Sequence, residues 1–180
     1  LNEDRNNLLI LSVINDAEKS FDFLLNNHVN DINAKNKDGC NALMCAASSG
    51  FEDIAQRLIN ARADVNACDN EGNTALMYAT SKENSCVTIL LNAGADVNRV
   101  NQKGFDALYH VIGGYVALKY VTTDYKKTVH YISTEDTIKS LLNKGANLQI
   151  RYKNSDNQMP LLVAASNNKG FDVLQILVAC

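Results

Sequence analysis

Apolar residues recur along the chain at helical spacing and in the same order several times. After Gly39, Gly72 and Gly104 comes an Ala-Leu pair, followed by another small or branched apolar residue three positions after the leucine. A second stripe of apolar residues follows each Ala-Leu pair. Val87 and Leu90, for example, belong to the stripe that follows Ala75 and Leu76. Spacings of three and four residues place such side chains on one face of a helix. The pattern therefore predicts two short antiparallel helices per repeat, neither of which buries its apolar stripe alone.

The repeat has a nearly constant length. The three glycines are 33 and 32 residues apart, and each stands in a polar cluster typical of a tight turn. The phrase Ala-Asp-Val-Asn recurs in step at 63–66 and 95–98, and more loosely at 146–149. A period of this length predicts a helical solenoid, in which stacking between repeats forms the core.

These residues resemble the pattern of the ankyrin-repeat family. The family's turn glycine, T-P-L-H-x-A-A first helix, apolar second helix and G-A-D-V-N loop correspond to Gly72 and to residues 74–80, 87–91 and 94–98. The resemblance extends over essentially the whole chain and implies an all-α solenoid of stacked helix-turn-helix units with projecting turn tips. Met44 and Met77 replace the family's histidine, which hydrogen-bonds to the threonine, so we expect apolar packing there.

Five repeats are predicted. The first lacks the turn glycine, which fits the atypical form expected of a terminal repeat that caps the stack. The chain begins without methionine and ends at Val-Ala-Cys without a polar cap, so we expect a fragment of a protein with further repeats or another domain. The predicted bounds are 1–34, 35–67, 68–99, 100–150 and 151–180.

The fourth repeat is about 19 residues longer than the third, and we place an insertion at about 113–132. The second helix of this repeat is expected to begin at Ser133-Thr-Glu-Asp136, which resembles a capping box. The insertion either extends the two flanking helices, with a loop near 122–124, or forms a short hairpin favoured by its β-branched residues.

The resemblance implies a non-catalytic module that binds a partner protein through its turn tips and the concave face of its first helices. The insertion is a further candidate, because tyrosines interleaved with lysines supply rigid amphipathic contact area. The simpler alternatives are that the tip and groove residues are only solvated, and that the tyrosines only cover an edge of the fourth repeat. The candidates are the tips Lys37, Asp38, Asn70, Glu71, Gln102 and Lys103, the groove residues Ser48, Ser49, Ser81 and Lys82, and the tyrosines Tyr115, Tyr120, Tyr125 and Tyr131.

The amino-acid composition limits which classes of partner and which cellular compartment are expected for this protein. The net charge is −3 with both signs interspersed, whereas nucleic-acid-binding proteins concentrate Lys and Arg on one face. No apolar run approaches the roughly 20 residues that cross a bilayer. Five cysteines without metal-ligand spacing indicate free thiols in a reducing compartment. We therefore expect a monomeric cytoplasmic domain with no nucleic-acid partner and no membrane insertion; the nucleus, or a host cytosol for a secreted effector, are the other options.

The sequence contains no group of residues whose types and spacing predict a catalytic site. His28, His110 and His130 fall in different places of the repeat pattern with no ligand-spaced cysteine or carboxylate nearby, so no metal, cofactor or catalytic residue is expected. Asp64 and Asn66 are expected to bond turn backbone. Two other functions stay open: the targeting arm of a larger enzyme or secreted bacterial effector whose chemistry lies elsewhere, and a repeat stack that binds a small ligand.

Overall fold

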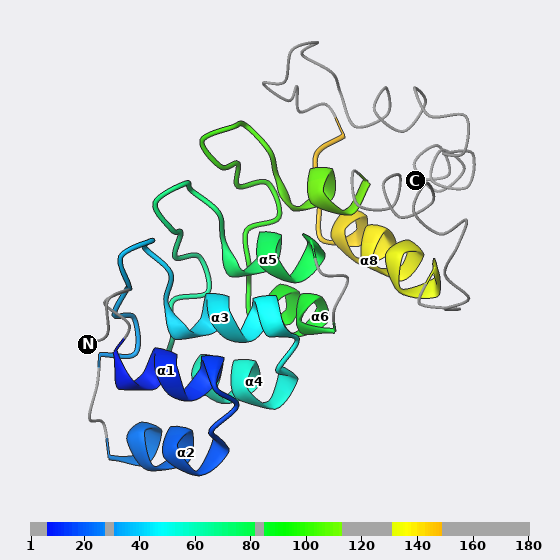
Figure 1. Ribbon diagram of the computed structural model, residues 1–180. Coiled ribbons are helices and arrows are strands. Elements are labelled where there is room, and N and C mark those ends of the chain that lie inside the picture. Colours follow the sequence, from blue (N-terminus) through cyan, green and yellow to red (C-terminus); the bar gives the residue numbers. More distant parts are fainter. Residues whose placement is uncertain (1–6, 28–30, 82–84, 113–130, 149–180) are drawn as a thin grey trace, which may run out of the picture. The chain divides into compact units, whose positions relative to one another are not determined.

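The computed structural model describes residues 7–27, 31–81, 85–112 and 131–148 of the chain. All the regular elements within these described residues are helices, as the all-α prediction requires. The chain divides into two compact blocks, residues 1–96 and 97–180, and each is described by itself. The helices are α1 (Leu8–Ile14), α2 (Glu18–Asn26), α3 (Ala42–Ser49), α4 (Glu52–Asn60), α5 (Ala75–Ser81), α6 (Cys86–Asn92), a helical stretch at 107–112, and α8 (Tyr131–Asn143) (Figure 1).

The first helix of each described repeat begins at a side-chain cap. In the later repeats the capping residue stands two positions after the turn glycine, so turn and helix start are encoded together. A cap accepts a hydrogen bond from one of the four N–H groups that have no partner within the helix. The caps and the residues whose N–H they bind are Asn7 with Ile10 (2.8 Å), Asn41 with Met44 (3.0 Å), Thr74 with Met77 (3.4 Å) and Asp106 with Tyr109 (2.8 Å).

The N-terminal block is a stack of helix pairs. α3 packs against α1, α5 and its own α4, and α4 packs against α6 (Figure 1). The fully buried leucines Leu43, Leu58 and Leu76 form the centre of this core. Met44 and Met77 are buried as well, which confirms the expected apolar packing in place of the family's histidine. Each helix pair therefore buries apolar side chains of the neighbouring pair, and the core lies between the stacked pairs.

The glycine turns ahead of the first helices and the loops that close the repeats both use backbone with positive φ. The predicted turn glycines are confirmed, with φ of +85° at Gly72. The loop that closes the third repeat has Gly94 at +87°, and the same position in the second repeat is Arg62 at +67°. A residue with a Cβ atom pays a conformational cost there that glycine does not. The second repeat thus tolerates a strained residue at its closing loop.

Asparagines of the Asp-x-Asn phrase connect neighbouring repeats. The Oδ1 atom of Asn66 accepts a hydrogen bond from the N–H of Asp96 at 2.8 Å, and its Nδ2 donates to the carbonyl of Gly94 at 3.2 Å. In the C-terminal block Asn98 makes the same pair of bonds, to Asn147 and Gly145. The expectation that this phrase bonds turn backbone is confirmed, and the backbone belongs to the following repeat.

The C-terminal block contains the helical stretch 107–112 and α8. Leu108 and Ile112 of the first and Ile138 and Leu141 of the second are fully buried. The prediction that this second helix begins at 133–136 is wrong, because α8 already begins at Tyr131. Neither glycine nor proline interrupts the sequence there, so nothing prevents the helix from starting earlier. Most of the predicted insertion and the whole fifth repeat lie outside the described residues, so the repeat count stays a prediction.

Candidate partner-binding surface

The six predicted tip residues all lie on turns and are exposed. Asn70 connects two tips of the N-terminal block. Its N–H donates to the carbonyl of Asp38 at 3.0 Å, and its Nδ2 donates to the carbonyl of Lys37 at 2.8 Å. Lys35 adds a bond from its Nζ to the carbonyl of Cys68 at 2.7 Å. The turns of the second and third repeats are therefore held together as one row.

The predicted groove residues lie at the ends of the first helices. Ser48 is half-buried and Ser49 exposed at the end of α3, and Ser81 ends α5 with its Oγ donating to the carbonyl of Tyr78 at 2.9 Å. Tyr131 is the first residue of α8, and its side chain is not among those described. Lys82, Tyr115, Tyr120 and Tyr125 lie outside the described residues, so a role for them in binding stays a prediction.

A polar cluster that the sequence analysis did not single out joins the turns to the first helices. Tyr78 on α5 is half-buried, and its phenol donates to Oδ2 of Asp69 at 2.6 Å. The Sγ atom of Cys40, from the preceding repeat, lies 3.7 Å from the same phenol oxygen. Asp69 also accepts from the N–H groups of Glu71 (2.9 Å) and Asn73 (2.7 Å). We call Cys40, Asp69, Asn73 and Tyr78 the Tyr78 cluster.

The protonation of the Tyr78 cluster follows from these contacts. Burial acts to raise the pKa of Asp69, but hydrogen bonds from Tyr78 and Asn73 outweigh it and lower that pKa, so the carboxylate is charged at neutral pH. Burial and the bond to Asp69 raise the pKa of Tyr78, so the phenol keeps its proton. Burial raises the pKa of Cys40, and that of Cys45 to about 11. Protonated thiols are poor nucleophiles, so the cluster supports hydrogen bonding rather than covalent chemistry.

The comparison with known proteins places this architecture in a family. A family profile described as "Ankyrin repeats (3 copies)" matches residues 8–101, just over half of the chain. The chain belongs to the ankyrin-repeat family. This ankyrin chain is 40% identical over 80 residues to "Neurogenic locus notch homolog protein 2" of Homo sapiens, and 38% identical over 76 residues to "Neurogenic locus notch homolog protein 1" of Mus musculus. These matches cover 44% and 42% of the chain but only 3% of each relative.

Ankyrin repeats are in general non-catalytic modules of protein–protein interaction. Within the parts of the chain that the structure describes, no group of three or more His, Cys, Asp or Glu side chains is placed to hold a metal ion. In the same parts, no helix has the length and apolar character needed to cross a membrane. The four described cysteines, Cys40, Cys45, Cys68 and Cys86, are free thiols.

One signal in the sequence marks the Tyr78 position. Between repeats, the Ala-Leu pair of the first helix is constant, whereas the position two residues after that leucine is Cys45, Tyr78 and His110 in turn. All three are half-buried, unlike the buried leucines beside them. The core residues around this position stay the same from repeat to repeat, but the residue at this position changes. Core packing therefore does not require one particular side chain here. Internal comparison of this kind points to the surface of the first helices, although it does not reveal the bond to Asp69.

His110 belongs to an aromatic group in the C-terminal block. The rings of Phe105 and Tyr109 stack with centroids 3.8 Å apart and planes 4° apart, and the His110 ring meets Phe105 edge-on at 6.5 Å. Its Nε2 atom is buried and has no hydrogen-bond partner among the described residues. Burial, helped by the charge of Lys103, lowers the pKa of His110. The imidazole is therefore neutral at physiological pH and acts as part of an apolar surface.

Proposed function

We propose that this ankyrin domain binds a partner protein through the turn tips of its second and third repeats together with the Tyr78 cluster. The observation that supports this most is the fixed orientation of the Tyr78 ring, whose phenol is held by Asp69 at 2.6 Å. A side chain that is immobilised before binding loses little conformational entropy on binding. Tyrosine also combines a large apolar surface with a polar handle, and it is enriched among residues that dominate binding energy.

The row of tips beside this ring favours a particular kind of partner. Lys37 and Asp38 lie on one exposed turn and Glu71 on the next, so the two neighbouring turns carry charges of both signs. Charged residues at the rim of an interface set its register and suppress wrong partners more than they add affinity. We therefore propose a partner segment that places an apolar side chain on the Tyr78 ring and charges of both signs against the tips.

A captured partner provides the first test of this surface. Proteins retained by the chain from a lysate of the source organism are identified by mass spectrometry, and the affinity of a purified partner is then measured for single variants. Tyr78→Ala is expected to weaken binding by about 30-fold, as for a hot-spot residue. Tyr78→Phe keeps the ring and is expected to bind more tightly than Tyr78→Ala.

The matched control is Gln56→Ala on α4. Gln56 is exposed, and its side chain donates to Asn60 of the same helix at 2.9 Å, so its loss is expected to leave affinity unchanged. If Tyr78→Ala keeps the far-UV circular dichroism of the parent chain and also keeps its affinity, the Tyr78 surface is not the binding site.

The tyrosine-rich insertion is the second part of the proposal and is tested separately. A variant in which residues 114–131 are replaced by a short linker removes Tyr115, Tyr120, Tyr125 and Tyr131 together. Retention of the partner by this variant would assign recognition to the tips and the Tyr78 cluster. Loss of the partner only in this variant, with Tyr78→Ala unaffected, would move recognition to the insertion.

A further inference from the structure

Cys40 and Cys45 occupy two particular positions at the start of α3. Cys40 directly precedes the capping residue Asn41, and Cys45 follows that cap by four positions. Side chains at these two positions of a helix often pack against each other, in a contact that fixes the angle at which the chain enters the helix. Both thiols are half-buried. We call Cys40 and Cys45 the thiol pair.

The third repeat shows how closely these two positions approach each other. Asn73 precedes the cap Thr74, and Tyr78 follows it by four positions. The Nδ2 atom of Asn73 donates to Oδ2 of Asp69 at 3.0 Å, and the phenol of Tyr78 donates to the same oxygen at 2.6 Å. Because they share one acceptor atom, the ends of the Asn73 and Tyr78 side chains lie close together.

The C-terminal block repeats this arrangement with aromatic side chains. Phe105 precedes the cap Asp106, and His110 follows it by four positions. Their rings meet edge-on with centroids 6.5 Å apart. The two positions therefore converge in both later repeats, although the side chains differ. Asn41 caps α3 through the same bond to the N–H three residues further on, so the thiol pair is expected to converge in the same way.

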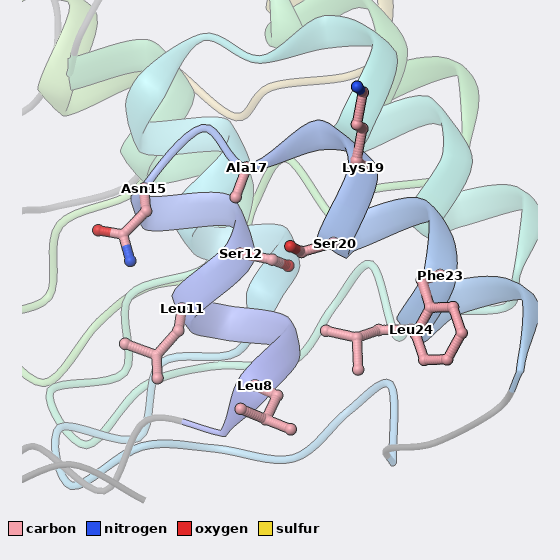
Figure 2. A pocket seen from close by; sticks show the side chains of 9 residues that line it. All are labelled: Leu8, Leu11, Ser12, Asn15, Ala17, Lys19, Ser20, Phe23 and Leu24. Carbon is pink, nitrogen blue, oxygen red and sulfur yellow. The ribbon is translucent and has the colours of Figure 1, made fainter.

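Side chains four positions after the cap lie at the border between core and solvent. In the first repeat this residue is Leu11, one of the residues that line a depression of about 550 Å³ between α1 and α2 (Figure 2). The equivalent residues of all four described first helices are half-buried, and they are Leu11, Cys45, Tyr78 and His110. A small reagent in solution can therefore reach a side chain at this position.

The acid–base state of the thiol pair determines how fast it reacts. Burial raises the pKa of Cys40 and raises that of Cys45 to about 11, and the charge of an ionised Cys40 contributes to the rise at Cys45. Both thiols are protonated at neutral pH, so their exchange with a disulfide is slow there. A reduced form that is not stabilised as thiolate also gives up its disulfide less readily once the bond has formed. The pair is therefore suited to slow, reversible oxidation.

We propose that Cys40 and Cys45 form an intramolecular disulfide by exchange with a low-molecular-weight disulfide such as oxidised glutathione. The thiolate of one cysteine attacks oxidised glutathione, which forms a mixed disulfide and releases one reduced glutathione. The thiolate of the other cysteine then attacks the protein sulfur of the mixed disulfide, which closes the bond and releases the second glutathione. The two cysteines are oxidised, the glutathione disulfide is reduced, and the two thiol protons end on the two glutathione molecules.

This disulfide changes the surface beside Tyr78. The Sγ atom of Cys40 lies 3.7 Å from the phenol oxygen of Tyr78, and a bond to Cys45 engages the sulfur that makes this contact. Binding of a partner at Tyr78 therefore becomes sensitive to oxidation. This consequence rests on the proposed function, whereas formation of the disulfide does not.

Peptide mapping tests the disulfide, because trypsin releases the thiol pair in one peptide. Cleavage after Lys37 and after Arg57 gives residues 38–57, which contain Cys40 and Cys45 and no other cysteine. The purified chain is equilibrated at defined ratios of oxidised to reduced glutathione, starting from either form, and its remaining thiols are blocked with N-ethylmaleimide. The disulfide form of this peptide lacks two hydrogen atoms and carries no blocking group, whereas the reduced form carries two.

The folded chain is compared with the chain unfolded in urea. We expect the folded chain to be half oxidised at a glutathione ratio about ten-fold less oxidising than the unfolded chain requires, because the fold raises the effective concentration of one thiol at the other. Cys45→Ser is the matched control and is expected to leave Cys40 free or bound to one glutathione. The proposal is overturned if the folded chain needs a ratio as oxidising as the unfolded chain, or if it forms only mixed disulfides.

The dependence of the reaction on pH tests whether buried thiols carry it. The rate of bond formation in the folded chain is expected to rise about ten-fold per pH unit between about pH 7 and 9, because both thiols titrate above this range. A rate that does not change with pH would contradict the assignment.

A captured partner tests the effect on binding separately. The affinities of the oxidised and the reduced chain for that partner are expected to differ. Equal affinities would overturn the effect on binding and leave the disulfide in place, while Tyr78→Ala reports on the binding surface itself.

Discussion

Two glycines with the same backbone conformation allow a repeat contact to be measured apart from backbone strain. Gly39 has φ +81° and Gly94 has φ +87°. A Cβ atom on Gly94 would meet nothing within 4 Å, whereas on Gly39 it would lie 2.5 Å from Oδ1 and 2.6 Å from the backbone N of Asn70 in the next repeat. Alanine at Gly94 therefore tests backbone strain alone, and alanine at Gly39 tests strain together with the loss of the contact between tips.

The expected free-energy costs follow from these contacts. Left-handed backbone costs an alanine about 1–2 kcal/mol, so Gly94→Ala is expected to destabilise the fold by that amount. Gly39→Ala adds displacement of Asn70 and of its two hydrogen bonds to Lys37 and Asp38, each contributing about 0.5–1.5 kcal/mol. The total for Gly39→Ala is then about 2–5 kcal/mol.

Urea unfolding followed by far-UV circular dichroism measures both costs, since the chain has no tryptophan. The comparison uses midpoints, with equal m values as the condition that both variants unfold in the same way. Equal destabilisation by the two substitutions would falsify the reasoning, because it would mean that the tips separate without cost. A smaller penalty for Gly39→Ala in an Asn70→Gly background would trace the extra cost to Asn70 itself.

Three further predictions follow from single residues. Asn66→Ala is expected to cost about 1–3 kcal/mol in urea unfolding, because the bonds to Asp96 and Gly94 are both lost. Arg62→Gly is expected to raise stability by about 1 kcal/mol in the same assay, because Arg62 holds a φ of +67°, and an unchanged midpoint would contradict this. Burial lowers the pKa of His110 from 6.5, so the unfolded chain binds its proton more tightly and stability falls as pH drops through this value. His110→Leu is expected to flatten the dependence of the urea midpoint on pH between about 5 and 7.5, and a dependence as steep as in the parent chain would refute the assignment.

The helices and their turns were predictable because their signals are local. The cap at Asn41 binds an N–H three residues away, and the glycine two positions earlier supplies the turn that precedes it. The start of α8 was missed for a related reason. A Ser-x-x-Asp sequence such as 133–136 favours a helix start without excluding an earlier one, and α8 begins at Tyr131.

The candidate site was predictable only in part. Exposure of the tips follows from the turns, so Lys37 and Glu71 lie where the pattern indicated. The Tyr78 cluster was missed, because the bond between Tyr78 and Asp69 depends on how a turn folds back onto a helix. Asn70 was expected at the surface as a binding residue, and its bonds to the neighbouring tip give it a structural role as well.

The sequence by itself determined the period, the helix pairs, the turns and the family, since each depends on residues within about one turn of helix or on their recurrence. Only the tertiary structure decided which repeat each side chain meets. Asn66 binds a loop 28 to 30 residues away, and Arg57 pairs with Asp22 of the preceding repeat. The exposure of Leu8 and Phe23 likewise became visible only in the structure. The order of the repeats in the stack decides which residues these side chains contact, because repeats of similar sequence have different neighbours at each position of the stack.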